Sequence, residues 1–274
     1  MTSFQKVIKY LAICLAIFIC ITLFSGIVSG IKTLFESFNF IDDKDNSYSE
    51  VINYNEEFKY LDISLKSSGL IIKTGDKFIV DTSDNNIKIY NKKSTLKIVD
   101  NRKSIFNIKS KKTIITIPYN YSFEKVKIET GTGKVDINGV YTNSLEMELG
   151  AGKASLNNIV SNKTHIETGI GSVNISNSKL NDLNLELGVG KVDIVAEVIG
   201  ESSIEAGVGK LNLSLNLPLY EYTFELEKGF GEIKLNNRNI KKDSKIGEGS
   251  NRIKIEGGIG SIVINTSEKK NLSN

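Results

Sequence analysis

Apolar residues recur along this chain in short alternating runs, which are joined by a repeated glycine pair, Gly-x-Gly. The first glycines of five successive pairs are 19 residues apart: Gly131, Gly150, Gly169, Gly188 and Gly207. Two further pairs begin at Gly229 and Gly258, 22 and 29 residues further on, which predicts insertions at about 216–222 and 236–250. A short repeat of this kind is typical of a solenoid.

Three columns of the aligned repeats are apolar in every copy, at three residues before the first glycine and at four and six residues after it. They contain Ile128, Met147, Ile166, Leu185, Ile204, Leu226 and Ile255; Val135, Ala154, Val173, Val192, Leu211, Ile233 and Ile262; and Ile137, Leu156, Ile175, Ile194, Leu213, Leu235 and Ile264. Alternation on both sides of the glycines predicts two strands per repeat, each with one face inward. A strand that returns one repeat later beside its own copy must pair in parallel.

The glycine pairs mark the corner where one sheet passes into the other, where the backbone needs positive φ or very close approach. Glycine-rich loops also bind phosphate, but no helical pattern follows any pair and no Gly-Lys-Ser or Gly-Lys-Thr occurs. The structural role is therefore favoured. The fold class predicted is all-β, a parallel β-solenoid with two strands per coil of roughly 19 residues, after one N-terminal transmembrane helix.

The remaining sequence divides around this repeat. Before it, alternating runs predict strands at 60–65, 70–73, 78–81, 87–90, 96–99 and 114–117. We expect five segments: an anchor at 1–31, a juxtamembrane linker at 32–57, irregular N-terminal coils or a cap at 58–125, the repeats at 126–265, and a polar tail at 266–274.

An uncharged stretch of 22 residues, Tyr10–Ile31, is long enough to span a membrane as a helix. Lys6 and Lys9 precede it and no acidic residue does, so the positive-inside rule keeps the N-terminus cytoplasmic and exports the rest. A cleaved signal peptide is the alternative, although the apolar run is longer than usual. A lipoprotein is disfavoured because bulky Ile13 precedes Cys14. The predicted location is the cell membrane, single-pass, with the solenoid extracellular.

Charge and cysteine content limit the classes of partner and of binding site that the chain can have. Removing Lys6 and Lys9 from 35 basic residues leaves 33 against 32 acidic ones, so the exported part is close to neutral. Binding to nucleic acid would require a basic face, and no nucleic-acid partner is predicted. Both cysteines, Cys14 and Cys20, fall in the anchor, so the exported part offers no disulfide and no thiolate ligand.

The most regular polar feature is a glutamate two residues before the first glycine in all seven copies: Glu129, Glu148, Glu167, Glu186, Glu205, Glu227 and Glu256. Because the glutamate alternates with the apolar columns, it is predicted to point outward and to form a stacked ladder of carboxylates. We expect Lys134, Lys153, Lys191 and Lys210, across the corner, to offset part of the repulsion within this ladder. Calcium binding is the alternative. Calcium-binding β-rolls repeat an aspartate in the turn, and most copies here have another residue at that position. No metal ligand and no cofactor are therefore predicted.

Catalysis is not predicted, and no catalytic residue is proposed. A β-helix glycosidase or lyase would need distinct carboxylates in one groove, whereas these columns repeat smoothly. The one histidine, His165, stands in an outward column with Lys127, Glu146 and Asn184 in neighbouring copies, and is interpreted as a surface residue.

The runs Leu70-Ile71-Ile72 and Thr116-Ile117-Pro118, with the stacked Gly-x-Gly units, resemble the bacterial "putative adhesin" family, also described as a toast-rack-like β-solenoid domain of unknown function. The resemblance covers about 58–265. It implies an envelope protein linked to membrane segments and to envelope stress signalling. The function predicted is a non-catalytic, membrane-anchored surface module that binds or scaffolds an envelope component; a β-helix carbohydrate-active enzyme and a calcium-binding β-roll remain the alternatives.

Overall fold

The computed structural model describes residues 50–54, 57–102 and 111–267, the first range by its backbone alone. Within these ranges the chain is all-β, with one 3₁₀ turn, η1 (Leu219–Glu221). That turn is far too short to cross a membrane, and no other helix occurs among the described residues. The predicted anchor at 1–31 lies outside them, as do most of the predicted linker and tail.

Seventeen strands make up the described fold. They are β1 (Glu50–Tyr54), β2 (Tyr60–Ser67), β3 (Gly69–Gly75), β4 (Phe78–Thr82), β5 (Ile87–Lys92), β6 (Thr95–Asp100), β7 (Lys112–Pro118), β8 (Ser122–Asn181), β9 (Leu183–Ile199), β10 (Glu201–Glu205), β11 (Val208–Pro218), β12 (Tyr222–Glu227), β13 (Phe230–Leu235), β14 (Arg238–Ile240), β15 (Ser244–Ile246), β16 (Asn251–Glu256) and β17 (Ile259–Ser267). The six strands predicted before the repeat are confirmed as β2 to β7, each within a few residues of its predicted bounds.

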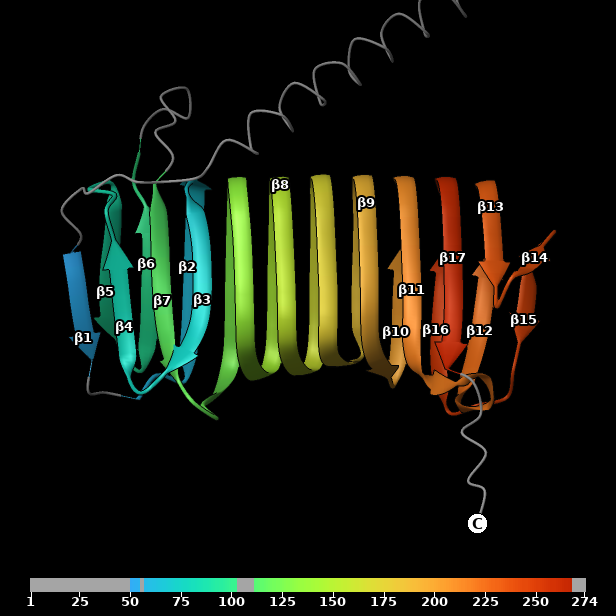
Figure 1. Ribbon diagram of the computed structural model, residues 1–274, viewed down its shortest axis with the longest axis horizontal. Helices are drawn as coiled ribbons and strands as arrows, with labels where there is room; N and C mark the ends of the chain where they lie inside the picture. Colours follow the sequence, from blue (N-terminus) through green and yellow to red (C-terminus); the bar gives the residue numbers. More distant parts are fainter. Residues whose placement is uncertain (1–49, 55–56, 103–110, 268–274) are drawn as a thin grey trace, which may run out of the picture. The chain divides into compact units, whose positions relative to one another are not determined.

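Each repeat forms one coil with two legs that meet at the Gly-x-Gly corner (Figure 1). The first leg precedes the glycines and the second follows them, and β8 passes through three such corners without a break. Parallel pairing one repeat apart is confirmed, because Ile166 lies opposite Leu185 in the first legs and Val173 lies opposite Val192 in the second. Coils of constant length therefore stack like residue on like residue.

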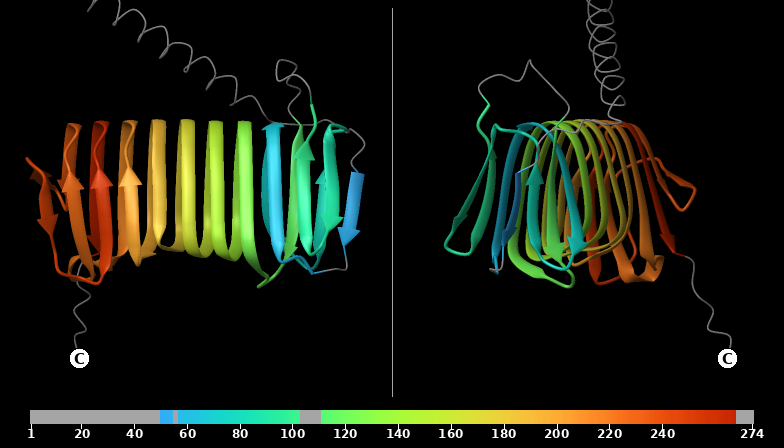
Figure 2. Two further views of the ribbon diagram at one scale, coloured as in Figure 1. Left: turned by 180° about the vertical axis from the view of Figure 1, so that it is seen from behind. Right: turned by 60° about the vertical axis from the view of Figure 1, so that its left-hand side comes forward.

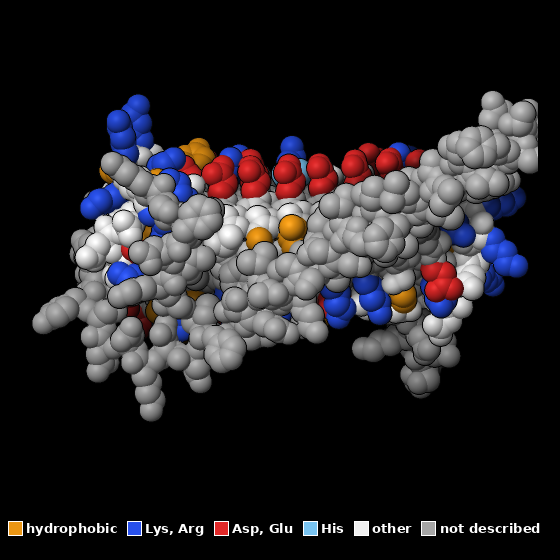
Figure 3. Space-filling model, turned by 90° about the horizontal axis from the view of Figure 1, so that it is seen from above, with side chains coloured by type: hydrophobic (Ala, Val, Ile, Leu, Met, Phe, Trp, Pro, Cys, Tyr) orange, Lys and Arg blue, Asp and Glu red, His pale blue; other side chains and the backbone are white. Residues whose placement is uncertain are grey.

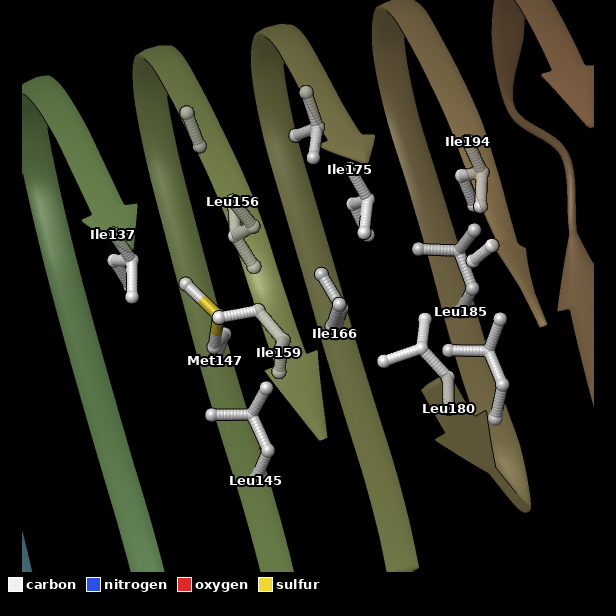
Figure 4. Packing of buried hydrophobic residues seen from close by; sticks show 14 of the residues in the cluster. Ile137, Leu145, Met147, Leu156, Ile159, Ile166, Ile175, Leu180, Leu185 and Ile194 are labelled. Atoms are coloured by element: carbon white, nitrogen blue, oxygen red, sulfur yellow. The ribbon is translucent and has the colours of Figure 1, made fainter. Parts of the chain in front are cut away.

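The core lies between the two legs. Every residue of the three predicted apolar columns is buried, at 5% exposure or less. Figure 4 shows buried side chains from both legs pointing into one interior. Met147 and Leu145 lie on the same leg, and Ile166 lies beside Leu185 of the next coil. Burying an aliphatic side chain of this size contributes about 1.5–3 kcal/mol, so the columns are the main source of stability.

At the N-terminal end the chain order and the stacking order differ. Strands β2 and β3 form a coil that lies between β6–β7 on one side and β8 on the other, with parallel pairing on both sides. Strands β5 and β4 then pair in antiparallel fashion with β6 and β7, and β1 pairs with β4. The first coil along the chain is therefore an internal one.

The C-terminal end shows the same inversion. Strand β16 lies between β10 and β12, and β17 lies between β11 and β13, so the coil that begins at Gly258 sits inside the one that begins at Gly229. The expectation that each repeat stacks beside the next holds for the first five copies and is wrong for the last two. The predicted insertions have a role here: the first carries the chain past one coil position, and the second contains β14 and β15.

Antiparallel strands close both ends of the stack (Figure 2). At the C-terminal end β15 pairs with β12 and β14 pairs with β13. Large aromatic side chains also gather at the ends, with Phe78 packed edge-on against Phe58 and Tyr121 at one end and Tyr222 near Phe224 at the other. Short strands with a different direction leave no long parallel edge for another copy to extend.

Candidate functional site

The two glycines of each corner have different structural roles. The second glycine has positive φ in six of the seven corners, as in Gly171 at +155° and Gly190 at +147°. The first glycine does not, but a Cβ added at Gly169 would overlap the carbonyl oxygen of Gly150 in the coil before it. Both reasons predicted for glycine are confirmed: close approach of the neighbouring coil at both members of the pair, and positive φ at the second.

The residue between the two glycines lies at the outer edge of the corner. In stacking order these seven residues, which we call the corner ridge, are Thr132, Ala151, Ile170, Val189, Val208, Ile259 and Phe230. Val189 is 38% exposed, Ile259 56% and Phe230 88%. Six of the seven are apolar, so this edge of the solenoid presents a hydrophobic row to solvent.

The glutamate ladder runs along the first legs, beside the ridge. Glu186 pairs in register with Glu167 and Glu205, and Glu256 lies between Glu205 and Glu227. Seen from above, the acidic side chains form a row along one side of the solenoid (Figure 3). The predicted outward ladder is confirmed, in the stacking order of the coils.

The cations that contact the ladder come from the column two residues earlier. Lys127 Nζ lies 2.6 Å from Glu129 and 3.6 Å from Glu148, and Lys254 lies 2.6 Å from Glu256. Hydrogen bonding to Glu256, with a further contribution from Glu227, raises the pKa of Lys254 to about 12. These lysines remain charged at any physiological pH and offset part of the repulsion.

The predicted partners across the corner are not the ones observed. Lys134 contacts Asp136 at 2.8 Å and Lys191 contacts Asp193 at 2.6 Å, both on the same second leg. The prediction was wrong because a lysine at this position reaches the residue two further along its own strand face more easily than a glutamate beyond the corner. The second legs therefore carry a separate, exposed basic column: Lys134, Lys153, Lys191 and Lys210, with Ser172, Ser261 and Glu232 in the other coils.

His165 is half-buried within this surface. Its Nε2 lies 2.9 Å from Glu167 Oε1 and its Nδ1 lies 3.1 Å from Asn184 Nδ2. Ligand atoms of His165, Glu167 and Glu186 all lie within 4.8 Å of one another, and they are the one such group among the described residues. These three could hold a divalent cation. The ring already has partners on both nitrogens, so the arrangement also stands without one.

The surface offers room for a ligand and the interior does not. A groove of about 590 Å³ runs beside the ridge on the acidic side of the first coils, lined by Glu129, Glu148 and Glu167 with Thr130 and Leu149. The space among the corner residues is only about 40 Å³. Organic ligands occupy sites of several hundred cubic ångströms, so recognition belongs on the outer surface.

The described fold agrees with a family model that matches residues 62–257, which is the Toastrack DUF4097 domain. The chain belongs to the Toastrack family. This match covers the N-terminal coils and nearly all of the repeats. It confirms the resemblance drawn from the sequence.

Two solved structures are similar to this Toastrack chain. A putative adhesin from Bacteroides fragilis is 18% identical, with 80% of this chain and 97% of that one covered and a TM-score of 0.52. A putative cell adhesion protein from Clostridium sporogenes is also 18% identical, with 80% and 99% covered and a TM-score of 0.39. The similarity to the Bacteroides fragilis protein shows a shared fold and nothing further. No curated protein matches the chain.

One cluster of this Toastrack domain was missed in the sequence. Buried Arg102 donates from Nε to Asp100 Oδ2 at 2.6 Å and from Nη2 to Ser68 Oγ at 2.9 Å, and it also contacts Asp84. The side chains of Asp84 and Asp100 are almost completely buried. Burial opposes ionisation of Asp84, but hydrogen bonds from Asn86 and Ser68 and the charge of Arg102 outweigh it, so the pKa of Asp84 is lowered.

This cluster lies where the glycine pair is absent. Lys66, Ser67 and Ser68 occupy the corner that packs under Gly131 and Gly133, and the backbone nitrogens of Lys66 and Ser67 donate to Asp100. The network therefore closes a corner that lacks glycines and has a structural role. Asp84, Asp100 and Arg102 fall outside the repeat, and no spacing rule could have joined them.

Proposed function

We propose that this Toastrack chain is a non-catalytic, adhesin-like surface module that binds or scaffolds an envelope component. One observation carries the proposal: the acidic ladder and the corner ridge continue from coil to coil, with a lysine on the second leg of four coils, and no coil forms a distinct centre. A surface that repeats every coil suits an extended partner, because each coil adds a similar contact. The protein of similar fold from Bacteroides fragilis is described as a putative adhesin, in keeping with such a role.

We propose further that the module is anchored in the cell membrane by Tyr10–Ile31, with the N-terminus in the cytoplasm and the solenoid outside. The length of this uncharged run and the lysines before it support the orientation. Anchoring would hold the binding surface close to the envelope. The same arrangement would allow occupancy of the solenoid to report envelope stress to the cell.

The absence of catalysis is part of the proposal. Acid and base groups of a glycosidase differ in environment, which separates their pKa values. Here the ladder glutamates repeat in equivalent positions, and His165 is held by Glu167 and Asn184. A glycan hydrolysis screen on the full chain checks this, and reproducible turnover of any substrate would favour the enzyme alternative.

The binding role is tested by capture of envelope components with the full anchored chain. A variant without 126–265 should lose the captured component. Deleting one complete repeat, 151–169, should keep the fold and weaken capture in proportion, because it removes one equivalent contact. If the one-repeat deletion abolishes capture while the melting temperature stays near the parent value, the site is local and the extended surface is wrong.

The calcium alternative has its own test. The ladder already has Lys127 and Lys254 beside it, which calcium would have to displace or tolerate. We expect no change in melting temperature at millimolar calcium. A rise that disappears in a Glu167→Gln, Glu186→Gln variant would favour a metal array over a solvated ladder.

A further inference from the structure

The corner ridge is an exposed apolar row with opposite charges on its two sides. The acidic ladder lies on the first legs, and the basic column lies on the second legs beyond the corner. Figure 3 shows this edge with hydrophobic side chains between the acidic row and lysines. Because successive coils are about 4.8 Å apart, the three rows run side by side for about 30 Å.

An apolar row of this length on a soluble surface usually marks an interaction site. Its exposure is largest in the last two coils of the stack, where Ile259 and Phe230 are more than half exposed. The partner must present a similar apolar row with a basic row facing the ladder and an acidic row facing the lysines. A second copy of the same edge meets these requirements in one orientation.

We propose that two copies of this chain associate edge to edge along the corner ridge, with their solenoid axes parallel. A two-fold axis parallel to the solenoid carries the acidic side of one copy over the basic side of the other, so that Glu148 faces Lys153 of the second copy. The pairing occurs twice in each of the four coils whose second leg carries a lysine, once from each copy.

The antiparallel alternative is disfavoured by the same charges. A two-fold axis perpendicular to the solenoid, within the plane of contact, places acidic row against acidic row and basic row against basic row. Like charges opposed along a shared seam cost free energy at each coil, as at the flanking positions of a coiled coil. Charge therefore selects the parallel pair, in which each coil meets its own counterpart.

This inference goes beyond the proposed function, since self-association requires no particular envelope component. It is compatible with that function, because parallel copies place their N-terminal ends together. A parallel pair would also bring two groove surfaces beside one seam. The two proposals fail separately: capture can be lost with the pair intact, and the pair can be absent with capture intact.

Cysteine crosslinking in the full chain tests the orientation, because the described residues contain no cysteine. In a background with Cys14→Ser and Cys20→Ser, we place one cysteine at a time at Ala151, Val189 or Ile259. A parallel pair predicts that each variant forms a disulfide-linked homodimer by itself. Asn162→Cys, at an exposed position of β8 away from the corner, is the control and should remain monomeric.

The outcomes separate the possible partners of the ridge. Crosslinking at only one of the three ridge positions, together with a mixed dimer of the Ala151 and Ile259 variants, would establish the antiparallel arrangement and overturn the proposal. Failure of all three, or crosslinking to another protein instead, would also overturn it. Outward ridge positions tolerate cysteine in the fold, and unchanged melting temperatures would verify this for each variant.

Charge reversal gives a second readout. Glu148→Lys or Lys153→Glu alone sets like charges against each other twice in the pair, and we expect each to lower the dimeric fraction of the Val189→Cys protein roughly threefold to tenfold. The double variant Glu148→Lys, Lys153→Glu should restore it. Equal dimer yield in all four proteins would contradict facing acidic and basic rows.

Discussion

Single residues act through the backbone at the corners of this solenoid. The second glycine of a pair has a positive φ that other residues rarely adopt, and the first lies against the carbonyl of the preceding coil. Neither effect depends on what the neighbouring side chains are. The residue between the glycines has no such restriction, which is why threonine, alanine and phenylalanine all occur there.

Gly190→Ala tests the corner. Its φ of +147° belongs to a region that costs about 1–3 kcal/mol for other residues, and the new Cβ would also overlap Gly171. We expect at least that loss in the free energy of unfolding, measured by urea titration. Ala151→Ser, at the unrestricted middle position, should change it by less than about 0.5 kcal/mol.

Arg102→Met tests the buried network. It would leave Asp84 and Asp100 buried without their cation, and breaking such a pair costs about 3–5 kcal/mol. Lys97→Met, which removes the partly exposed pair with Asp62, is the matched control and should cost less than about 1 kcal/mol. Equal losses in the two variants would show that burial does not distinguish the pairs.

Asp84 also predicts a pH dependence. Its pKa in the folded chain is lowered, so the stability it contributes is complete above its unfolded pKa of about 3.9 and is lost as pH falls through the folded pKa. We expect the stability gap between the parent and Asp84→Asn to narrow below about pH 4. Urea titrations at pH 7 and pH 3 measure the gap; a constant value would contradict the assignment.

At the scale of the strand, the outward-facing columns determine which residues form rows on the surface. Each strand carries an apolar inner face and a polar outer face, and stacking turns every outer position into a row. Repeating glutamate creates repulsion within its row. Cations two residues earlier on the same face, Lys127 and Lys254, relieve part of it.

Lys127→Gln tests this relief. Lys127 contacts Glu129, Glu146 and Glu148, so its loss should lower the free energy of unfolding by up to about 1 kcal/mol at low salt. The difference should shrink at 1 M sodium chloride, where the screening length is about 3 Å. Lys153→Gln, on the other side of the corner, should have no comparable effect.

At the scale of the whole molecule, the order of the coils is inverted at both ends of the stack. The first and last coils along the chain each lie one position inside the stack, held between two others. The first and last coils, which would most easily fray from a solenoid, are therefore paired on both sides. Antiparallel strands then cover the outermost coils.

Deleting 251–274 tests this arrangement. Without β16 and β17 the outer coil of β12 and β13 loses the coil that joins it to β10 and β11, so it should detach together with its cap of β14 and β15. We expect loss of more than one coil. This loss should lower both the dependence of the unfolding free energy on denaturant concentration and the melting temperature. Deleting 151–169, an internal repeat, should leave one cooperative transition; similar behaviour of both deletions would argue against the inverted order.

Much of the fold was predictable because one physical signal repeats. The nineteen-residue spacing, the three apolar columns and the outward glutamates each follow from alternation within a strand, which sequence alone displays. The strands of the N-terminal region were found for the same reason. The partners of the ladder were not, because side-chain reach across a corner depends on its three-dimensional width.

Long-range order belonged to the tertiary structure. That β16 enters between β10 and β12, and that Arg102 joins Asp84 and Asp100, depends on which distant segments meet, and no local pattern encodes it. Sequence determined what one coil is, because a coil is built from local alternation and glycine geometry. The tertiary structure decided the order of the coils. Every coil presents nearly the same pairing edge, so the strands at the ends and the insertions determine which coil lies beside which.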